Sequence, residues 1–331
     1  MRGKVKGSAA VRRWFATAED ALETHRARLD LLNVYPVADS DTGSNMLATI
    51  RASRAAVESS DQEDLGALLA AAGARAMGSA QGNSGTLLAV LISGFAEPLS
   101  GQERLTVNAL SRGLDRASLR GWSALSQPVP GTMLSVLDAA RDQARACASA
   151  AVAPDSRAAV EEALPRVVVA AREAVAGTEH QLPELSQAGV VDSGGLGLLL
   201  VLAALSATVR AEQVDDHLLH GLSGWDAALK PSAYPTPSDY CACKESTNDE
   251  PLSGVELMCT VRLNPLKAAE LRHRLDELGE SVIITPIGSE ADQDGNLRWR
   301  IHVHTEQPDA TLEAVRTSGP LEDSSTTPLS R

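Results

Sequence analysis

The chain is predicted to be a two-domain protein, with an all-helical first domain followed by a small α+β domain. Apolar residues recur at helical spacing from residue 8 to residue 211, and almost no strand pattern appears there. Residues 212–252 contain three closely spaced prolines and a polar run that ends at Glu250, which predicts a linker. From Gly254 onward, strand patterns alternate with helical ones.

Eight helices are expected in the first domain, residues 8–211. Each segment is long enough to bury an apolar face, and Gly, Pro and Ser residues separate the segments. The predicted ranges are 8–32, 43–58, 62–78, 83–97, 103–120, 131–149, 156–177 and 194–210. Loops at one end of such a bundle can hold a ligand with helix N-termini and side chains together.

The second domain is expected over residues 253–320. Its predicted strands are 255–263, 281–286 and 297–304, and its predicted helices are 266–278 and 309–316. The polar residues 321–331 are expected to form a tail.

Composition excludes several classes of protein. With 331 residues, 44% hydrophobic and 22% charged, the chain can bury a large core. A net charge of −13 disfavours nucleic-acid and membrane-surface binding. No signal-peptide core follows the basic N-terminal residues, and the longest apolar runs fall short of the roughly 20 residues that cross a bilayer. We therefore expect a cytoplasmic protein without a membrane span, whose four cysteines are reduced: Cys147, Cys241, Cys243 and Cys259.

Two carboxylates, Asp39 and Asp41, stand in a short polar turn that leads into a predicted helix. Carboxylate oxygens suit Mg²⁺, with substrate phosphates completing its coordination, and a helix N-terminus offers N–H groups to an anion. The residues alone leave an alternative, an Asx-rich turn that only caps the helix. Asn33 is likewise either a ligand or a turn residue.

Two further polar segments precede apolar helices. The backbone N–H groups and Ser84 hydroxyl of residues 82–85 suit phosphate oxygens, although such a segment is also an ordinary helix cap. Asp192 is placed to cap the helix that follows it.

The stretch from Asn33 to Met46 resembles a signature of the nucleotide domain shared by the A subunit of bacterial fatty acid kinase and the L subunit of dihydroxyacetone kinase. It departs from that signature at Ala38, Ser40 and Ser44. The resemblance continues in order through residues 82–85, 128–133 and 188–195. Residues 278–282 and 301–305 are similar to the middle domain of the fatty acid kinase protein, which favours that branch.

The resemblance implies an eight-helix barrel-like bundle that binds ATP or ADP with magnesium. Asp39 and Asp41 would be the magnesium ligands and catalytic residues, and Thr132 and Met133 would line the adenine end of the site. The implied nucleotide-binding residues are Asn33, Thr42, Asn45, Met46, Gly82, Asn83, Ser84, Gly85, Thr132, Met133, Asp192 and Gly194.

His302 and His304 fall on one face of a predicted strand, a spacing that suits a shared metal ion. In the fatty acid kinase protein the corresponding pair belongs to a zinc site completed by a cysteine. Alignment places Glu256 at that cysteine position, whereas Cys259 lies on the opposite strand face. The expected zinc ligands are therefore His302, His304 and Glu256, and the alternative is a structural histidine pair without metal.

The resemblance implies a kinase subunit that phosphorylates a fatty acid carboxylate presented by a separate fatty-acid-binding protein, and it suggests a homodimer. It covers roughly residues 10–320, without the third domain of full-length relatives that docks this partner. Two alternatives stay open. One is a protein of the dihydroxyacetone kinase type, which the second domain, with His302 and His304, disfavours. The other is a non-catalytic nucleotide-binding scaffold, to which the departures at Ala38 and Ser40 point.

Overall fold

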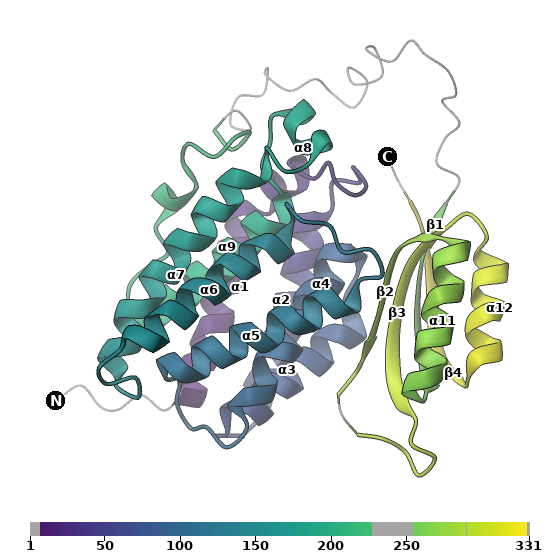
Figure 1. The fold of residues 1–331 in the computed structure, drawn as a ribbon, viewed down its shortest axis with the longest axis horizontal. Coiled ribbons are helices and arrows are strands. Elements are labelled where there is room, and N and C mark those ends of the chain that lie inside the picture. Colours follow the sequence, from purple (N-terminus) through teal and green to yellow (C-terminus); the bar gives the residue numbers. More distant parts are fainter. Residues whose placement is uncertain (1–6, 227–253, 289, 330–331) are drawn as a thin grey trace.

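The computed structural model describes residues 7–226, 254–288 and 290–329. Figure 1 shows a helical first domain beside a smaller domain in which a sheet carries two helices. The predicted fold class is confirmed. The helices of the first domain are α1 (Gly7–Leu31), α2 (Thr42–Glu58), α3 (Leu65–Ser79), α4 (Gly82–Ala96), α5 (Val107–Ala124), α6 (Met133–Ala150), α7 (Arg157–Thr178), α8 (Pro183–Ala188) and α9 (Ser193–Arg210), with short 3-10 turns η1 (Glu97–Leu99) and η2 (Asp216–Leu219).

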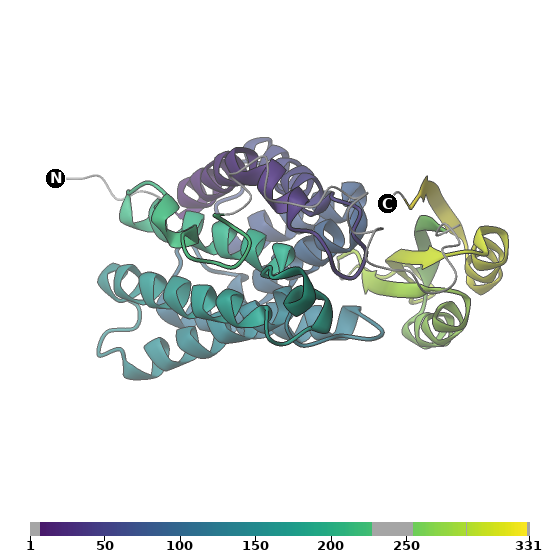
Figure 2. The same ribbon diagram turned by 90° about the horizontal axis from the view of Figure 1, so that it is seen from above.

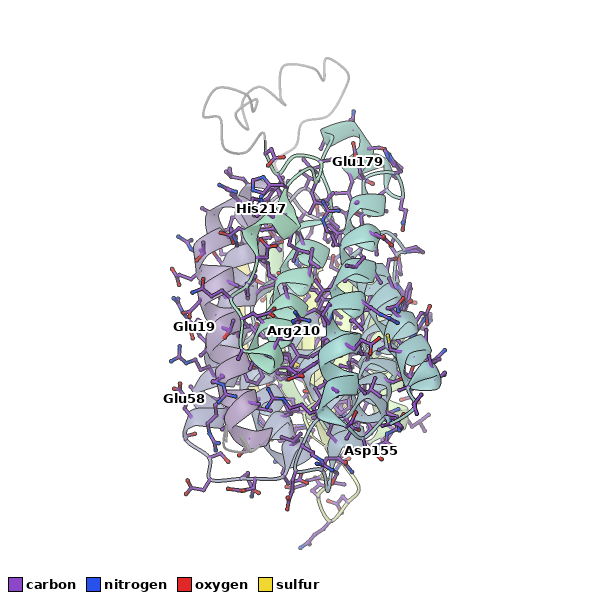
Figure 3. The ribbon with its side chains drawn as sticks, turned by 90° about the vertical axis from the view of Figure 1, so that its left-hand side faces the viewer. Glu19, Glu58, Asp155, Glu179, Arg210 and His217 are labelled. Carbon is purple, nitrogen blue, oxygen red and sulfur yellow. The ribbon has the colours of Figure 1, made fainter. Side chains whose placement is uncertain are left out.

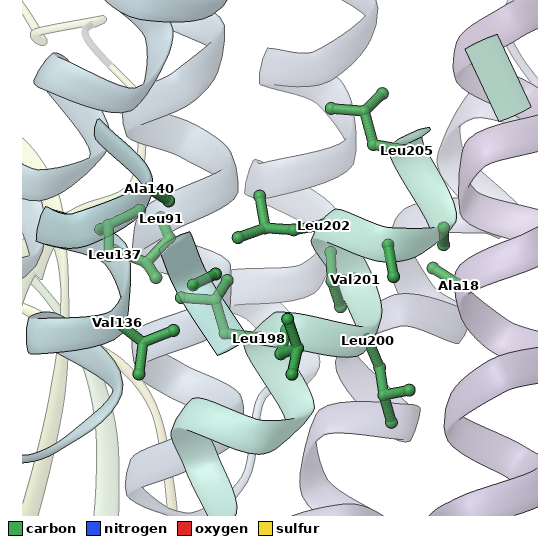
Figure 4. Packing of buried hydrophobic residues seen from close by; sticks show 14 of the residues in the cluster. Ala18, Leu91, Val136, Leu137, Ala140, Leu198, Leu200, Val201, Leu202 and Leu205 are labelled. Carbon is green, nitrogen blue, oxygen red and sulfur yellow. The ribbon is translucent and has the colours of Figure 1, made fainter. Parts of the chain in front are cut away.

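Helix α9 lies inside the first domain. Its sequence is apolar on all sides, and residues from Leu196 to Ala207 are buried along its whole length. In Figure 4, Leu198 faces Val136 and Leu137 of α6, while Ala18 of α1 lies on the other side of α9. Within the described residues, α9 alone has the length and apolarity of a membrane span, and 83% of that stretch is buried in the protein. Its position in the core accounts for its apolar surface.

Charged side chains project from the outer surface of the helices. Figure 3 shows Glu19, Glu58, Asp155, Glu179 and Arg210 on this surface. Some of them pair across neighbouring helices: Arg54 of α2 bonds to Glu19 of α1 and to Glu58 of its own helix. Charges kept in water at the surface leave the helix interiors to apolar packing.

The described part of the predicted linker packs against the first domain. Leu219, Leu222 and Trp225 are almost fully buried and belong to the same apolar core as α1 and α9. Residues 212–226 thus continue the helical domain in the structure, contrary to the expectation of a linker from residue 212. The remainder of the predicted linker, with Cys241 and Cys243, lies outside the described residues.

The second domain is a four-stranded antiparallel sheet in the order β2-β3-β1-β4. Its elements are β1 (Val255–Leu263), α11 (Pro265–Leu278), β2 (Glu280–Pro286), β3 (Leu297–Thr305), α12 (Pro308–Ser318) and β4 (Leu321–Pro328). Strand β4 occupies residues that were predicted to form a tail. It pairs with β1 through Leu321 to Pro328 and forms one edge of the sheet.

The two sheet faces have different partners. Leu257, Cys259 and Val261 point into a core shared with α11 and α12. Because side chains alternate along a strand, Glu256 and Met258 point to the other face. Figure 2 shows the helical domain on that side of the sheet and α11 and α12 on the far side.

The domains meet through both apolar and backbone contacts. Ile283 of β2 is fully buried among residues of α3, α4 and α5, including Met77, Val90 and Ala124. The N–H of Ser126 donates to the carbonyl of Val282 at 3.0 Å. Arg272 of α11 donates to the carbonyl of Ser123 at 2.8 Å. The start of β2 is therefore fixed against the segment that joins α5 to α6.

Candidate functional site

A cavity of about 330 Å³ lies where four helices of the first domain begin and β2 starts. The N-termini of α2, α4, α6 and α9 all contribute to its wall, so the positive ends of several helices gather around it. Such an arrangement attracts anions. The lining residues are Asn33, Tyr35, Pro36, Val37, Asp39, Asp41, Thr42, Asn83, Ser84, Leu87, Leu125, Ser126, Gln127, Val129, Thr132, Met133, Asp192, Gly194, Glu280, Ser281 and Val282.

Asp39 and Asp41 form an acidic pair in this wall. Burial and the neighbouring Asp41 raise the pKa of Asp39 to about 7, and burial raises the pKa of Asp41. Asn33 donates a hydrogen bond from its carboxamide to Oδ1 of Asp39, which orients that carboxylate. Two crowded carboxylates disfavour full ionisation unless a cation lies between them.

Asp41 does not serve as an ordinary helix cap. It occupies the N-cap position of α2, but its side chain accepts no capping hydrogen bond. The capping alternative considered from the sequence therefore does not hold for this carboxylate, which is left to face the cavity.

The oxygen atoms around the cavity suit a hard cation. Asn83 also lines the cavity, and its Oδ1 is buried without a hydrogen-bond partner among the described residues, so the wall holds a further oxygen acceptor. Among the described residues that line the cavity, none is Lys, Arg or His. The residues present thus fit magnesium, which prefers a few carboxylate ligands together with water and phosphate oxygens.

Asp192 holds two helix starts together in the wall of the cavity. Its Oδ2 accepts the N–H of Gly195 at 2.6 Å, and Met133 at the start of α6 supplies a second backbone donor. Burial raises the pKa of Asp192 to about 6 despite these bonds. The predicted cap of α9 is confirmed, and the same residue also lines the cavity together with Thr132 and Gly194.

Four of the predicted nucleotide-binding residues do not line the cavity. Met46 is fully buried in the core of the first domain. Gly85 lies where a Cβ would press against Thr49 and the backbone of Asn45, so its role is the close packing of α2 on α4. Asn45 and Gly82 lie behind the acidic pair, where a Cβ on Gly82 would collide with the Asn45 carboxamide.

Two later segments of the chain complete the cavity wall, although the sequence does not predict them as part of the site. Leu125, Ser126 and Gln127 follow α5, and Glu280 to Val282 begin β2 in the second domain. Neither segment carries a pattern that signals binding. The positive φ of Ser281, 56°, marks a local strain that only the folded backbone reveals.

The predicted zinc ligands come together on the sheet face that meets the first domain. Oε1 of Glu256 lies 3.0 Å from Nδ1 of His302, and the His302 and His304 rings are 4.8 Å apart. However, the Glu256 carboxylate also accepts the N–H of Gly82 at 2.8 Å. Burial and the neighbouring His302 lower the pKa of His304 to about 4.

A zinc site is not supported. Across residues 7–226, 254–288 and 290–329, no group of three or more His, Cys, Asp or Glu side chains is arranged to hold a metal ion. Burial raises the pKa of Cys259 to about 12, and its thiol lies on the far face of the sheet, as predicted. The structure therefore favours the alternative, a structural histidine pair in which Glu256 is hydrogen-bonded to His302.

Two family models match the chain. Residues 36–207 match the DAK2 domain, and residues 254–330 match the FakA-like middle domain, which is named after the fatty acid kinase protein. An uncharacterized protein of Staphylococcus epidermidis is 30% identical over 305 residues, which cover 85% of this chain and 47% of that protein. Protein YloV of Bacillus subtilis is 26% identical over 311 residues, which cover 91% of this chain and 51% of that protein. The chain spans about half the length of these curated relatives.

Solved structures of the dihydroxyacetone kinase from C. freundii are also similar. The complex with AMP-PNP and Mg²⁺ aligns over 60% of this chain and 33% of that one, with 22% identity and a TM-score of 0.45.

Proposed function

Since the chain belongs to the DAK2-domain family and carries a FakA-like middle domain, we propose that it is an ATP- and magnesium-dependent phosphotransferase subunit. The proposed reaction moves the terminal phosphoryl group of ATP to the carboxylate of a fatty acid. A separate fatty-acid-binding protein presents the acid, and the product is an acyl phosphate. The proposed compartment is the cytoplasm, where ATP is available.

The acidic character of the cavity carries the proposal. A wall with Asp39, Asp41 and Asp192, and with no basic side chain among its described residues, would repel a polyphosphate on its own. Magnesium, when bound, neutralises charge on the phosphates and on the phosphoryl group being transferred. Asp39 and Asp41 would hold this cation, with Asn33 fixing the orientation of Asp39.

The remaining lining residues fit the nucleotide. The backbone N–H groups and side chains of Asn83 and Ser84, in the first turn of α4, would receive phosphate oxygens. Thr132, Met133, Asp192 and Gly194, at the starts of α6 and α9, would surround the adenosine end. Met46 and Gly85 are not among the proposed nucleotide contacts. The Met46 side chain is buried in the core, and Gly85 packs against Thr49 and Asn45 of α2.

The choice of a carboxylate acceptor rests on two observations. The second domain matches the FakA-like middle-domain model. In addition, a fatty acid is already ionised near neutral pH, so its attack on a phosphoryl group needs no general base, and the carboxylates of the lining stay free to hold a cation. A hydroxyl acceptor such as dihydroxyacetone would have to lose a proton.

Calorimetric titration with ADP, with and without magnesium, tests the nucleotide site. We expect magnesium-dependent binding by the wild type and its loss in Asp41→Ala, whereas Asp61→Ala, which removes an exposed carboxylate from a surface loop, should bind normally. The acceptor is tested by trapping acyl phosphate with hydroxylamine, using oleate on a fatty-acid-binding protein, and dihydroxyacetone in parallel. Wild-type protein that binds no nucleotide would reject the proposal.

A further inference from the structure

Glu256 of the second domain contacts the start of a helix in the first domain. Its Oε1 accepts the backbone N–H of Gly82 at 2.8 Å, although the two residues are 174 positions apart in the chain. Both the N–H and the carboxylate are buried. A charge-assisted hydrogen bond shielded from water is stronger than one at the surface.

The contact replaces a missing cap. Gly82 is the first residue of α4, and the N-cap residue before it, Gln81, makes no side-chain capping bond. The first N–H groups of a helix need an acceptor from elsewhere. Glu256 supplies one from another domain, and its negative charge also suits the positive end of the helix.

Gly82 packs against Asn45 and next to the carboxylate of Asp41. It has a φ of 61°, and a Cβ there would collide with the Asn45 carboxamide and lie 3.7 Å from Oδ2 of Asp41. The charge of Glu256 also contributes to the raised pKa of Asp41. The position of the Gly82 backbone therefore affects both Asp41 and the phosphate-facing residues Asn83 and Ser84 that follow it.

Glu256 is itself held in place. Nδ1 of His302 lies 3.0 Å from Oε1 of Glu256 and 3.1 Å from Sδ of Met258, and His302 is completely buried. The carboxylate cannot turn away from Gly82 without losing this partner. The docking of Ile283 and the bond from Ser126 to Val282 fix the sheet against the first domain nearby.

We propose that Glu256 is a positioning residue for the nucleotide site: its bond to Gly82 holds the N-terminus of α4 in register with Asp41, so that the second domain forms a working part of that site. The inference rests on the proposed nucleotide binding. It assigns to the second domain a role in the first step of the reaction, before any acceptor is engaged.

The test compares Glu256→Ala and Glu256→Gln with Glu322→Ala. Glu322 is a matched control, because it is a glutamate of the same sheet whose carboxylate pairs at 2.7 Å with Arg262 and Arg298, two residues of the second domain. Affinity for magnesium·ADP is measured by calorimetry, and the Gly82 amide resonance is followed in protein labelled with ¹⁵N-glycine.

We expect Glu256→Ala to weaken magnesium·ADP binding by about tenfold and to move the Gly82 resonance upfield. Glu256→Gln keeps an acceptor oxygen of the same size, so it should recover most of the affinity while still moving the resonance. Glu322→Ala should match the wild type in both measurements. Because glutamine preserves the shape of the side chain, this variant keeps the test decisive if the alanine variant loses its second-domain fold.

Two results would overturn the inference. One is an unchanged Gly82 resonance in Glu256→Gln. The other is wild-type affinity in a folded Glu256→Ala variant, which rejects the inference while leaving the proposed function intact. Wild-type protein that binds no magnesium·ADP rejects the proposed function and, with it, the positioning role.

Discussion

Asp30, near the end of α1, accepts two hydrogen bonds from Ser44 in the first turn of α2. The N–H of Ser44 lies 2.9 Å from Oδ1 of Asp30, and its hydroxyl lies 2.8 Å from Oδ2. In most helices the N-cap side chain accepts this N–H. Here the N-cap residue is Asp41, and because Asp30 takes its place, the Asp41 carboxylate stays available to the cavity.

Asp30→Ala should therefore weaken nucleotide binding without touching the nucleotide. The freed Ser44 N–H would compete for the Asp41 carboxylate, and we expect magnesium·ADP affinity to fall about tenfold. The lost cap should cost about 1 kcal/mol of stability. Calorimetry and urea unfolding measure the two effects. Ser44→Ala keeps the backbone bond to Asp30 and should lose much less affinity; equal affinity in Asp30→Ala and wild type would contradict this role.

Ile283 should contribute more to domain docking than any exposed residue of the second domain. It is fully buried in the apolar contact with α3, α4 and α5, so Ile283→Ala should lower the free energy of unfolding by about 2–5 kcal/mol. Urea unfolding measures the loss. Leu266→Ala, at a position that is 69% exposed on α11, is the matched control. A loss no larger than that of the control would show that the domains do not depend on this contact.

The sequence predicted those elements whose pattern is local. The long helices of the first domain repeat apolar residues over several turns, and β1, β2 and β3 are rich in β-branched and apolar residues. Helix α8 has six residues, too few to show a helical period. Strand β4 is polar and exposed, so only its pairing with β1 makes it a strand.

The residues of the candidate site also fall into two groups, those that a local sequence pattern predicts and those that only a tertiary contact brings to the cavity. Asp39, Asp41 and Asn33 are close in the sequence, so their chemistry was visible there. Ser126 and Glu280 reach the cavity only because β2 docks against the end of α5, a tertiary contact that no local pattern encodes. Met46 belongs to the same short motif as Asp39 and Asp41, but this motif contains packing residues as well as lining residues, and Met46 is fully buried in the core.

Trp225 should stabilise the first domain although it was expected in a linker. It is 1% exposed, its ring meets His25 edge-on at 5.3 Å, and the Arg28 guanidinium lies 4.9 Å from its centroid. Trp225→Ala should cost about 3–5 kcal/mol in thermal or urea unfolding. Leu31→Ala, at a 58% exposed position on α1, serves as the control. Comparable stability of the two variants would show that residues 212–226 do not stabilise the first domain and behave as a linker.

Asp192 should make stability fall as the pH rises. Burial raises the pKa of Asp192 in the folded protein from its ordinary 3.8 to about 6, so folding favours the protonated carboxyl. The resulting stabilisation is complete below the ordinary pKa and disappears as the pH rises through about 6. Asp192→Asn is always neutral and keeps an acceptor for Gly195. The free energy of unfolding of the wild type, relative to this variant, should therefore decrease between about pH 4 and about pH 7 and then level off.

Urea unfolding of the wild type and of Asp192→Asn across this pH range measures the difference between their free energies of unfolding. Groups that titrate alike in both proteins cancel in this difference. Asp142→Asn is the control, because Arg141 holds the pKa of Asp142 below its ordinary 3.8. Because this pKa is depressed, ionised Asp142 stabilises the folded protein at any pH above its ordinary pKa, and this stabilisation is lost only at lower pH. The difference in unfolding free energy between the wild type and Asp142→Asn should therefore be constant over the same range. A flat curve for Asp192→Asn as well would mean that Asp192 is ionised in the folded protein throughout, held by the N–H groups of Gly195 and Met133.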